Sequence, residues 1–220
     1  VADKLKSVSV VMCPPFVYTS TLLNSRTETT VKIGSQDAYF EEQGSYTGEI
    51  SPVMLKDLGV EYAIIGHSER RSKGETDEMI SKKVALCLEV GIIPILCIGE
   101  KVRDEGGSHL DFIKDQVKNS LNKVPKKNIS KLIIAYEPIW AIGAKEAMMP
   151  ESIYEMSLFI KKVLSDMYGH DEGISTPILY GGSVNFRNAL DIFNKGKIDG
   201  LLVGRESVNI TGFVELLKTV

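Results

Sequence analysis

The chain has 220 residues, and its 26 Lys and Arg residues against 29 Asp and Glu residues give a formal net charge of −3. This charge argues against a nucleic-acid-binding surface, and a composition of 43% hydrophobic and 25% charged residues excludes a largely disordered chain. The apolar runs are too short to cross a bilayer and the first residues do not form a signal peptide, so we expect a cytoplasmic protein with no membrane partner.

Short apolar runs alternate with amphipathic segments from one end of the chain to the other. The expected strands are Val8–Met12, Val31–Gly34, Tyr62–Ile65, Ile92–Cys97, Leu132–Tyr136, Ile178–Tyr180 and Gly200–Val203. Most of them are apolar at consecutive positions, which is typical of strands buried on both faces of a parallel sheet. The residues before the first strand, Val-Ala-Asp-Lys-Leu at 1–5, resemble the tail of a helix that runs into it.

Apolar residues at steps of three and four mark the expected helices. These are the segment from Leu110 to Val124 capped by Ser108, the segment Ile80–Leu88 ended by Gly91, the segment Ile153–Met167 between Pro150 and Gly169, and the segment capped by Asn185 and ended by Gly196. Proline near the start of a helix and glycine just past its end follow the usual asymmetry of helix termini.

Repeated strand–helix units predict an α/β protein whose parallel sheet is covered by helices. The periodicity leaves two architectures open, an open doubly wound sheet and a closed (β/α)₈ barrel. No linker divides the chain, so we expect one domain over residues 1–220. The expected strands number one fewer than the eight of a barrel, which suggests that a preceding segment is missing.

Two candidate catalytic residues follow expected strands. His67 comes directly after the run Ile64-Ile65, and the alternative is a core histidine that is hydrogen-bonded to backbone. Glu137 interrupts the apolar end of another strand and precedes the only tryptophan, Trp140. Burial raises the pKa of a carboxyl group and so makes a glutamate a competent base near neutral pH. The alternative is an acid that is paired with a Lys or Arg side chain.

Two glycine-containing segments are candidates for binding phosphate. Gly181-Gly182-Ser183 separates a strand from an expected helix, where backbone N–H groups suit an anion, although such a sequence is also a common tight turn. Gly204-Arg205 follows the next strand, and in barrels the loops after the last two strands often form one phosphate site.

Other kinds of site lack a sequence signal. No His or Cys pair has metal-ligand spacing and no nucleotide-binding motif is present, so we expect neither a metal nor a cofactor. The three cysteines, Cys13, Cys87 and Cys97, are an odd number without CxxC spacing and are interpreted as reduced thiols.

Three segments together closely resemble the triosephosphate isomerase family. They are Ile-Gly-His-Ser-Glu-Arg-Arg at 65–71, Ala-Tyr-Glu-Pro-Ile-Trp-Ala-Ile-Gly at 135–143 and Tyr-Gly-Gly-Ser-Val at 180–184, with support from Cys13-Pro14-Pro15, Thr47–Ser51 and Cys97–Glu100. The resemblance covers essentially the whole chain. It implies a (β/α)₈ TIM barrel and a cofactor-free aldose–ketose isomerase of glycolysis and gluconeogenesis, which interconverts dihydroxyacetone phosphate and glyceraldehyde 3-phosphate through an enediolate.

The same resemblance implies roles for individual residues. Glu137 is similar to the family's catalytic base and His67 to its electrophile, with Ser68 and Glu69 in supporting positions. The residues that resemble the phosphate-binding set are Gly143, Ser183 and Gly204, together with Gly181, Gly182 and Arg205. The loop from Pro138 to Pro150 is expected to close over the substrate and exclude water.

The segment Tyr39–Ser51 resembles the family's interdigitating loop. It implies a homodimer in which the neighbourhood of Thr47 lies beside the partner's active site. The alternative is a loop that folds onto its own barrel.

Three departures from the family pattern qualify these expectations. No residue matches the family's Asn-x-Lys strand, so we expect the first strand and helix to be missing and the chain as written to be inactive. The loop tip reads Gly143-Ala144-Lys145-Glu146 instead of Gly-Thr-Gly-Lys, and Gly204-Arg205 replaces Gly-Gly. Two alternative functions therefore stay open, an isomerase of another small sugar phosphate and an inactive phosphate-binding fragment.

Overall fold

The computed structural model of the chain describes residues 8–25, 30–144 and 146–220. These residues form two compact units. The N-terminal unit comprises the described residues up to Leu96 together with Asn119–Leu132, and the C-terminal unit comprises Cys97–Lys118 and Ile133–Val220. The helix tail expected at residues 1–5 and the loop-tip residue Lys145 lie outside the described residues.

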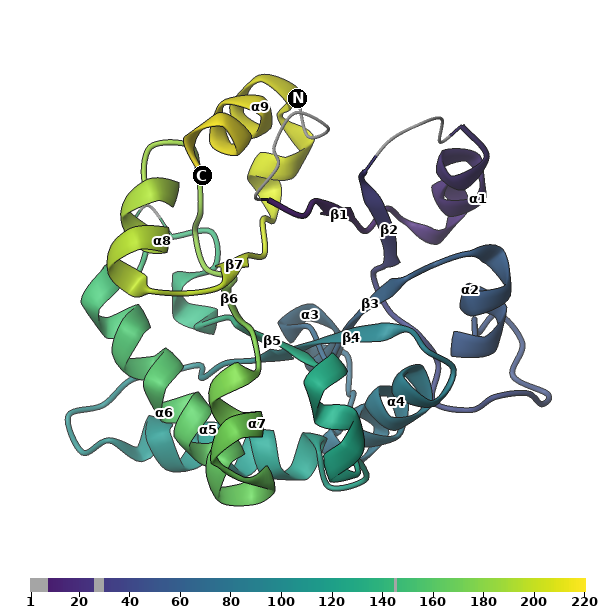
Figure 1. Cartoon of the computed structure of the whole chain (residues 1–220), viewed down its shortest axis with the longest axis horizontal. Coiled ribbons are helices and arrows are strands. Elements are labelled where there is room, and N and C mark those ends of the chain that lie inside the picture. The colour runs from purple at the N-terminus through teal and green to yellow at the C-terminus, as the bar shows by residue number, and fades with distance from the viewer. Residues whose placement is uncertain (1–7, 26–29, 145) are drawn as a thin grey trace. The chain divides into compact units, whose positions relative to one another are not determined.

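The N-terminal unit is built on four parallel strands (Figure 1). Met12 lies opposite Ile33, Ser35 opposite Ala63, and Ile65 opposite Leu96. The strands are β1 (Val11–Met12), β2 (Lys32–Ser35), β3 (Tyr62–Ile65) and β4 (Ile93–Ile98), and the helices are α1 (Phe16–Ser25), α2 (Pro52–Leu58), α3 (Ser68–Ser72), α4 (Asp77–Glu89) and the 3₁₀ helix η2 (Lys126–Lys131).

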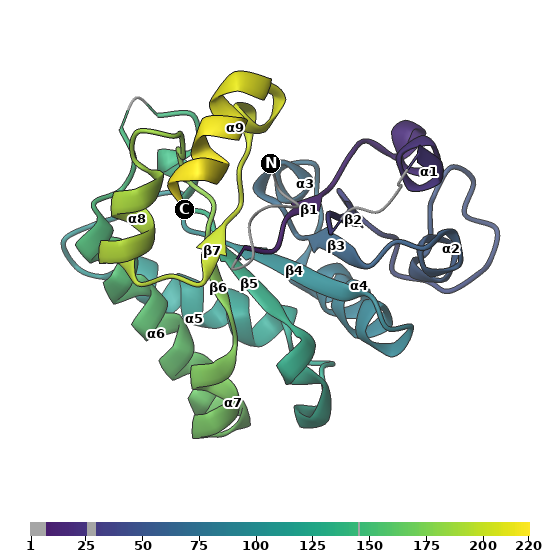
Figure 2. The same ribbon diagram turned by 45° about the horizontal axis from the view of Figure 1, so that its top comes forward.

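The C-terminal unit contains three further parallel strands, with Tyr136 opposite Tyr180 and Tyr180 opposite Leu201. Figures 1 and 2 show α6 beside α7 and α8. The strands are β5 (Ile133–Tyr136), β6 (Ile178–Tyr180) and β7 (Gly200–Leu201), the helices are α5 (Ser108–Ser120), α6 (Pro150–Tyr168), α7 (His170–Ser175), α8 (Ala189–Gly196) and α9 (Ile210–Thr219), and the 3₁₀ helices are η3 (Ile139–Ala141) and η4 (Arg205–Val208).

The strand order of the described residues follows the chain order from β1 to β7, so the prediction of an all-parallel α/β sheet is confirmed. The expected strand positions agree with those observed, except that β1 and β7 are shorter than expected. Helix α6 has the predicted termini, beginning at Pro150 and capped by Gly169. Among the described residues, none of the helices combines the length and the apolar composition that a bilayer crossing requires.

One predicted helix end and one predicted helix start are wrong. Helix α5 begins at Ser108, within one residue of the expected start, but it ends at Ser120 instead of continuing to Val124. Asp104 accepts a hydrogen bond from the Ser108 backbone N–H at 3.2 Å. Helix α8 begins at Ala189 because residues 185–188 form a turn, in which the Asn185 side chain accepts from the backbone N–H of Arg187 at 2.9 Å. An asparagine ahead of an apolar run favours a local turn as readily as a helix cap, and here the turn forms.

Candidate active site

Glu137 lies directly after β5, at the carboxyl end of the strand. Its residue is 3% exposed, so the burial that the sequence predicts for this acid is confirmed. The Glu137 backbone N–H donates to the carbonyl oxygen of Ile98 at 2.7 Å, which continues the strand pairing past Tyr136. The side chain therefore leaves a rigid, buried strand end.

Glycines make room for Glu137. A Cβ atom on Gly181 would lie 2.7 Å from Cγ and 3.2 Å from Oε1 of Glu137, and a Cβ atom on Gly99 would overlap the Glu137 carbonyl group. No side chain larger than hydrogen fits at either position without displacing the acid. Gly181, which the sequence indicated as part of a phosphate turn, therefore also forms the wall against which the Glu137 side chain packs.

A second buried acid, Glu100, organises the start of the loop that follows Glu137. The residue is 1% exposed and its carboxylate accepts hydrogen bonds from the Tyr136 hydroxyl and from Trp140 Nε1, both at 2.9 Å, and from Arg103 Nε at 3.0 Å. Burial, and next the Glu100 carboxylate, raise the pKa of Tyr136 far above its usual value, so its hydroxyl stays a neutral donor. This cluster fixes Trp140 at the beginning of the loop.

The loop from Pro138 to Met149 is fastened to the segment that follows β6. Ser183 Oγ donates to the Ala144 carbonyl at 2.9 Å, and its backbone N–H donates to the Ala141 carbonyl at 3.2 Å. Farther along the loop, the Met148 N–H donates to the Tyr180 hydroxyl at 3.1 Å. Both donors of Ser183 are thus engaged by the loop, and the phosphate contact expected of Ser183 stays a prediction.

Two of the expected phosphate-binding residues lie close together at the tip of this loop. Gly143 adopts the left-handed conformation with φ of +68°, and the guanidinium Nη2 of Arg205 lies 3.3 Å from the position that a Cβ atom would take on it. Gly204, which precedes Arg205 in the chain, is exposed, and a Cβ atom on it would meet no other atom within 4 Å. The C-terminal unit therefore places the cation of Arg205 beside the exposed Gly143.

His67 lies in the N-terminal unit, directly after β3, and is half-buried. Its Nδ1 accepts a hydrogen bond from the backbone N–H of Glu69 at 3.3 Å. A ring nitrogen that accepts carries no proton, so in the neutral ring the proton is on Nε2 and that atom is the donor. Ser68 is half-buried and begins α3, whereas the Glu69 side chain is exposed.

Ion pairs anchor the short helix α3 that follows His67. Arg71 Nε donates to the Gly66 carbonyl at 2.7 Å, and its guanidinium pairs with Asp77. Arg70 pairs with Asp37 at 2.9 Å and with Glu75 at 2.7 Å. These contacts fix the backbone on both sides of His67.

A buried lysine neutralises the same two acids. Lys83 of α4 is 1% exposed and its Nζ lies 2.8 Å from Asp37 and 2.6 Å from Glu75. Burial raises the pKa of Asp37, and the neighbouring Lys83 opposes that rise. We refer to Asp37, Arg70, Glu75 and Lys83 as the charged cluster.

The family model described as Triosephosphate isomerase matches residues 1–220. Relatives named triosephosphate isomerase include those of Fusobacterium nucleatum, 44% identical over 97% of this chain and 86% of the relative, and of Dictyoglomus thermophilum, 42% identical over 96% and 85%. That of Finegoldia magna is 44% identical over 98% of this chain and 87% of the relative. The chain belongs to the triosephosphate isomerase family.

Membership of the triosephosphate isomerase family decides between the two architectures that the periodicity left open, because this family has the TIM-barrel fold. It also identifies the chain as an isomerase. The names of the relatives favour triosephosphate isomerase activity over both alternatives, another sugar-phosphate isomerase and an inactive phosphate-binding fragment.

Several residues that shape the candidate site were not identified from the sequence. The sequence indicated Glu100 only within a segment that supports the family resemblance, and it indicated no role for Tyr136 or Tyr180. An acid after the apolar strand β4 gives the same signal as Glu137 after β5, so Glu100 could have been found by the same reasoning. Within the described ranges, no group of three or more His, Cys, Asp or Glu side chains could hold a metal ion.

Proposed function

We propose that this member of the triosephosphate isomerase family interconverts dihydroxyacetone phosphate and glyceraldehyde 3-phosphate with Glu137 as the base. The observation that carries the assignment is the burial of Glu137 at the carboxyl end of β5, against Gly181 and ahead of a fastened loop. The carboxylate removes a proton from carbon 1 of dihydroxyacetone phosphate to give an enediolate. The protonated acid then returns the proton to carbon 2, while the proton of the carbon-1 hydroxyl is transferred to the oxygen on carbon 2, which gives the aldehyde.

We infer that His67 is the electrophile, because it resembles the histidine that has this role in the family. The hydrogen bond from the Glu69 N–H to Nδ1 supports this role, because it leaves the Nε2 proton of the neutral ring to polarise an oxygen of the substrate. Triosephosphate isomerases are the standard example of a neutral histidine that acts in this way. Ser68 and Glu69 support His67 through the first turn of α3.

The substrate phosphate binds at the loop tip in this proposal. Backbone N–H groups of glycine-rich segments suit a phosphate, since nothing but hydrogen stands between the backbone and the anion. The proposed contacts are the backbone N–H groups of Gly143, Gly204 and Arg205, with Gly181 and Gly182 shaping the turn. Ser183 joins them when its N–H and Oγ leave the Ala141 and Ala144 carbonyls and donate to the phosphate instead. The loop from Pro138 to Pro150 excludes water from the enediolate, which eliminates phosphate when water is admitted.

Replacement of Glu137 by glutamine, in the protein expressed from its complete gene, tests the base. Glu137→Gln keeps the size of the side chain and removes its ability to take a proton, so we expect kcat to fall by about 10²–10⁴-fold while the fold and the affinity for inorganic phosphate are kept. A coupled assay in both directions measures kcat, and calorimetry measures phosphate binding.

The exposed acid Glu155 on α6, outside the loop, provides a matched control. Glu155→Gln removes the same charge without touching the strand end or the loop, and its kcat should stay within a few-fold of the parent. A Glu137→Gln enzyme with near-normal kcat would overturn the assignment of Glu137.

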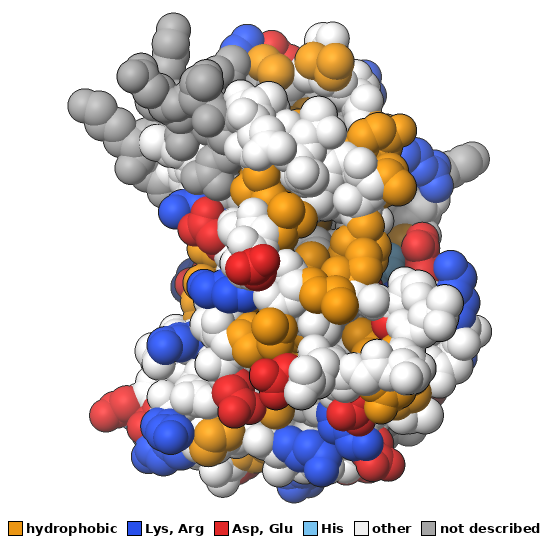
Figure 3. Space-filling view, turned by 90° about the vertical axis from the view of Figure 1, so that its right-hand side faces the viewer, with side chains coloured by type: hydrophobic (Ala, Val, Ile, Leu, Met, Phe, Trp, Pro, Cys, Tyr) orange, Lys and Arg blue, Asp and Glu red, His pale blue; other side chains and the backbone are white. Residues whose placement is uncertain are grey.

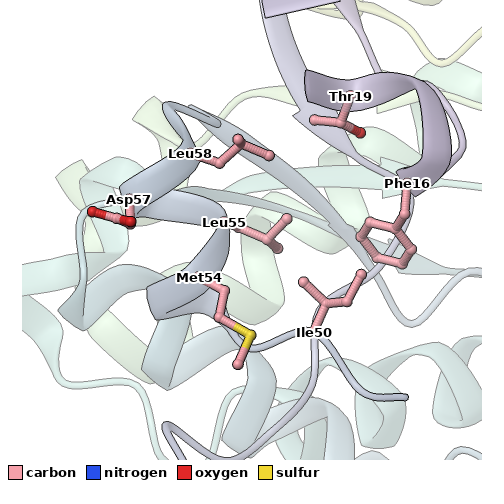
Figure 4. A pocket seen from close by; sticks show the side chains of 7 residues that line it. All are labelled: Phe16, Thr19, Ile50, Met54, Leu55, Asp57 and Leu58. Carbon is pink, nitrogen blue, oxygen red and sulfur yellow. The ribbon is translucent and has the colours of Figure 1, made fainter. Parts of the chain in front are cut away.

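A homodimer formed through Tyr39–Ser51 is the second part of the proposal. Within the N-terminal unit, Figure 3 shows hydrophobic side chains gathered on the face that carries α1 and α2. Phe16, Ile50 and Met54 point toward one another around a pocket between α1, the loop and α2 (Figure 4). Val17 on α1 is 78% exposed and Met54 is 57% exposed, and apolar surface of this kind favours a protein interface.

The dimer is tested by light scattering at micromolar concentration on the protein expressed from its complete gene. Met54→Asp places a charge in the proposed interface and should shift the protein toward the monomer. Ile174→Asp, on α7 of the C-terminal unit, changes a residue of similar exposure and should leave the assembly unchanged. A parent protein that is monomeric would exclude the homodimer.

Two further inferences accompany the function. We infer a cytoplasmic enzyme, which is supported by the absence of a disulfide among Cys13, Cys87 and Cys97, all three of which are described.

We also infer that residues 1–220 fold as one TIM-barrel domain, which is supported by the uninterrupted order of β1 to β7 and by the family match over the same residues. A single cooperative unfolding transition is expected for one domain.

A further inference from the structure

Arg205 connects two loops of the C-terminal unit. It begins η4, one residue after Gly204, and its guanidinium Nη2 reaches to 3.3 Å from the Cβ position of Gly143 at the tip of the other loop. The cation therefore lies beside the exposed Gly143, whose backbone N–H is a proposed phosphate contact, while the Arg205 backbone follows the second proposed contact, Gly204.

The charge of Arg205 is not neutralised within the described part of the chain. Arg70, Arg71 and Arg103 pair with carboxylates. Arg187 lies over the Phe186 ring, with its Cζ 5.4 Å from the ring centroid. The Arg205 side chain forms neither an ion pair nor a hydrogen bond with another described residue. An arginine without an internal acid keeps its donors for an external anion.

An anion from solvent can reach Arg205, because Gly143, Gly204 and Arg205 are all exposed. No atom lies within 4 Å of the Cβ position of Gly204, so the backbone next to Arg205 is also open to solvent. A guanidinium group presents two parallel N–H donors whose spacing matches two oxygens of a phosphate. Backbone N–H groups alone offer partial charges, so a full positive charge beside them favours the dianion over the monoanion.

We propose that the Arg205 side chain binds the phosphate dianion of the substrate directly. The proposal rests on the function proposed above, since it places a side-chain cation at the same phosphate site. The contact exists in the substrate complex and in the transition state alike. It therefore lowers KM and the Kd of phosphate anions more than it changes kcat.

Calorimetric titration with inorganic phosphate, together with steady-state kinetics, tests the proposal on the protein expressed from its complete gene. Arg205→Gln removes the charge, and we expect the Kd of phosphate and the KM of the substrate to rise by about tenfold. Arg205→Lys keeps the charge without the two-pronged geometry and should restore part of the affinity. The difference between the parent and Arg205→Gln should shrink as salt is added, because the exposed charge is screened.

Arg187→Gln is the matched control, because it removes an exposed arginine whose guanidinium lies over an aromatic ring. It should leave the Kd of phosphate unchanged. Circular dichroism verifies that each variant folds. Arg205→Gly removes the same charge and restores the residue more usual in the family, so it repeats the test with a second variant.

Equal phosphate affinity in the parent, Arg205→Gln and Arg205→Gly would overturn the proposal for Arg205. If the parent still isomerises the triose phosphates in that case, the proposed function is unaffected. A fall in kcat with an unchanged Kd would also overturn it and would identify Arg205 as a residue that positions the loop. A parent that neither isomerises the triose phosphates nor binds phosphate would contradict the proposed function and this inference together.

Discussion

The environments of Glu137 and His67 are built from different interactions. In the C-terminal unit, Glu137 is positioned by close backbone contacts, with Gly181 and Gly99 leaving space that only hydrogen can occupy. In the N-terminal unit, the helix after His67 is anchored by ion pairs, among them Arg70 with Asp37 and Glu75. Steric contacts therefore position the Glu137 side chain, whereas ion pairs anchor the helix that follows His67.

This difference predicts which substitutions each region tolerates. Around Glu137 an added methyl group should be harmful, because the packed backbone has nowhere to move. Around His67 the loss of a charge should be harmful, because buried carboxylates would lose a partner in a medium of low dielectric. Each prediction below alters one of the two regions.

The largest effect is expected in the charged cluster. Lys83→Met keeps most of the side-chain volume but removes the buried cation that lies 2.8 Å from Asp37 and 2.6 Å from Glu75. Breaking a buried ion pair from one side typically costs about 3–5 kcal/mol, and we expect that loss in the free energy of unfolding by urea.

The loss should also depend on pH. Burial already raises the pKa of Asp37 in the folded protein, and without Lys83 it rises further. A carboxyl group whose folded pKa exceeds its unfolded pKa contributes stability below the unfolded pKa and loses it as pH rises through the folded pKa. The stability difference between Lys83→Met and the parent should therefore be smaller at about pH 4 than at neutral pH.

The neighbouring residue Lys82 provides the control, because its side chain is partly exposed and its nearest acid, Glu78, is 3.8 Å away. Lys82→Met should cost at most about 1 kcal/mol. Equal losses in the two variants would mean that burial of the charged cluster is not what stabilises the N-terminal unit.

The sequence was most informative where the cause is local. Consecutive apolar residues predicted the strands, and Pro150 and Gly169 marked both ends of α6. Glu137 was found because an acid at the end of an apolar strand is conspicuous in the sequence alone. Where two asparagines stand close together, as at 185 and 188, the local signal did not separate a turn from a helix cap, and the helix start was placed too early.

Contacts between distant residues could not be predicted from spacing. Lys83 and Asp37 are 46 positions apart, and Met148 and Tyr180 are 32 apart. Each residue alone resembles an ordinary surface lysine, loop methionine or strand tyrosine. The steric role of Gly181 could not be predicted for the same reason, because glycine is required there by the side chain of Glu137, which follows a different strand.

An intermediate effect is expected when a methyl group is added beside the base. Gly181→Ala places Cβ 2.7 Å from Cγ of Glu137, so the acid must move. A displacement of about 1 Å at a reacting group costs roughly 10²-fold, and we expect kcat to fall by about that factor, with a stability loss of about 1–3 kcal/mol.

Gly106→Ala is the control for this substitution, since its Cβ would meet only the side-chain Oδ1 of Asp104, at 3.2 Å, on an exposed loop. It should leave kcat unchanged within a few-fold. A Gly181→Ala enzyme that keeps the parent kcat would show that Glu137 is not held by shape.

The smallest effect is expected at the far end of the loop. The Met148 N–H donates to the Tyr180 hydroxyl, and burial raises the pKa of Tyr180, so that hydroxyl stays neutral and able to accept. Tyr180→Phe removes the acceptor and leaves the packing of the ring. One such hydrogen bond contributes about 0.5–1.5 kcal/mol, so kcat/KM should fall by roughly two- to tenfold, with little change in stability.

Tyr154→Phe on α6, whose ring lies 4.8 Å from Lys197 Nζ, removes a hydroxyl elsewhere in the unit and should not change kcat/KM. A fall shared by both variants would trace the effect to the unit as a whole, whereas a fall in Tyr180→Phe alone would show that this single contact holds the loop over the base.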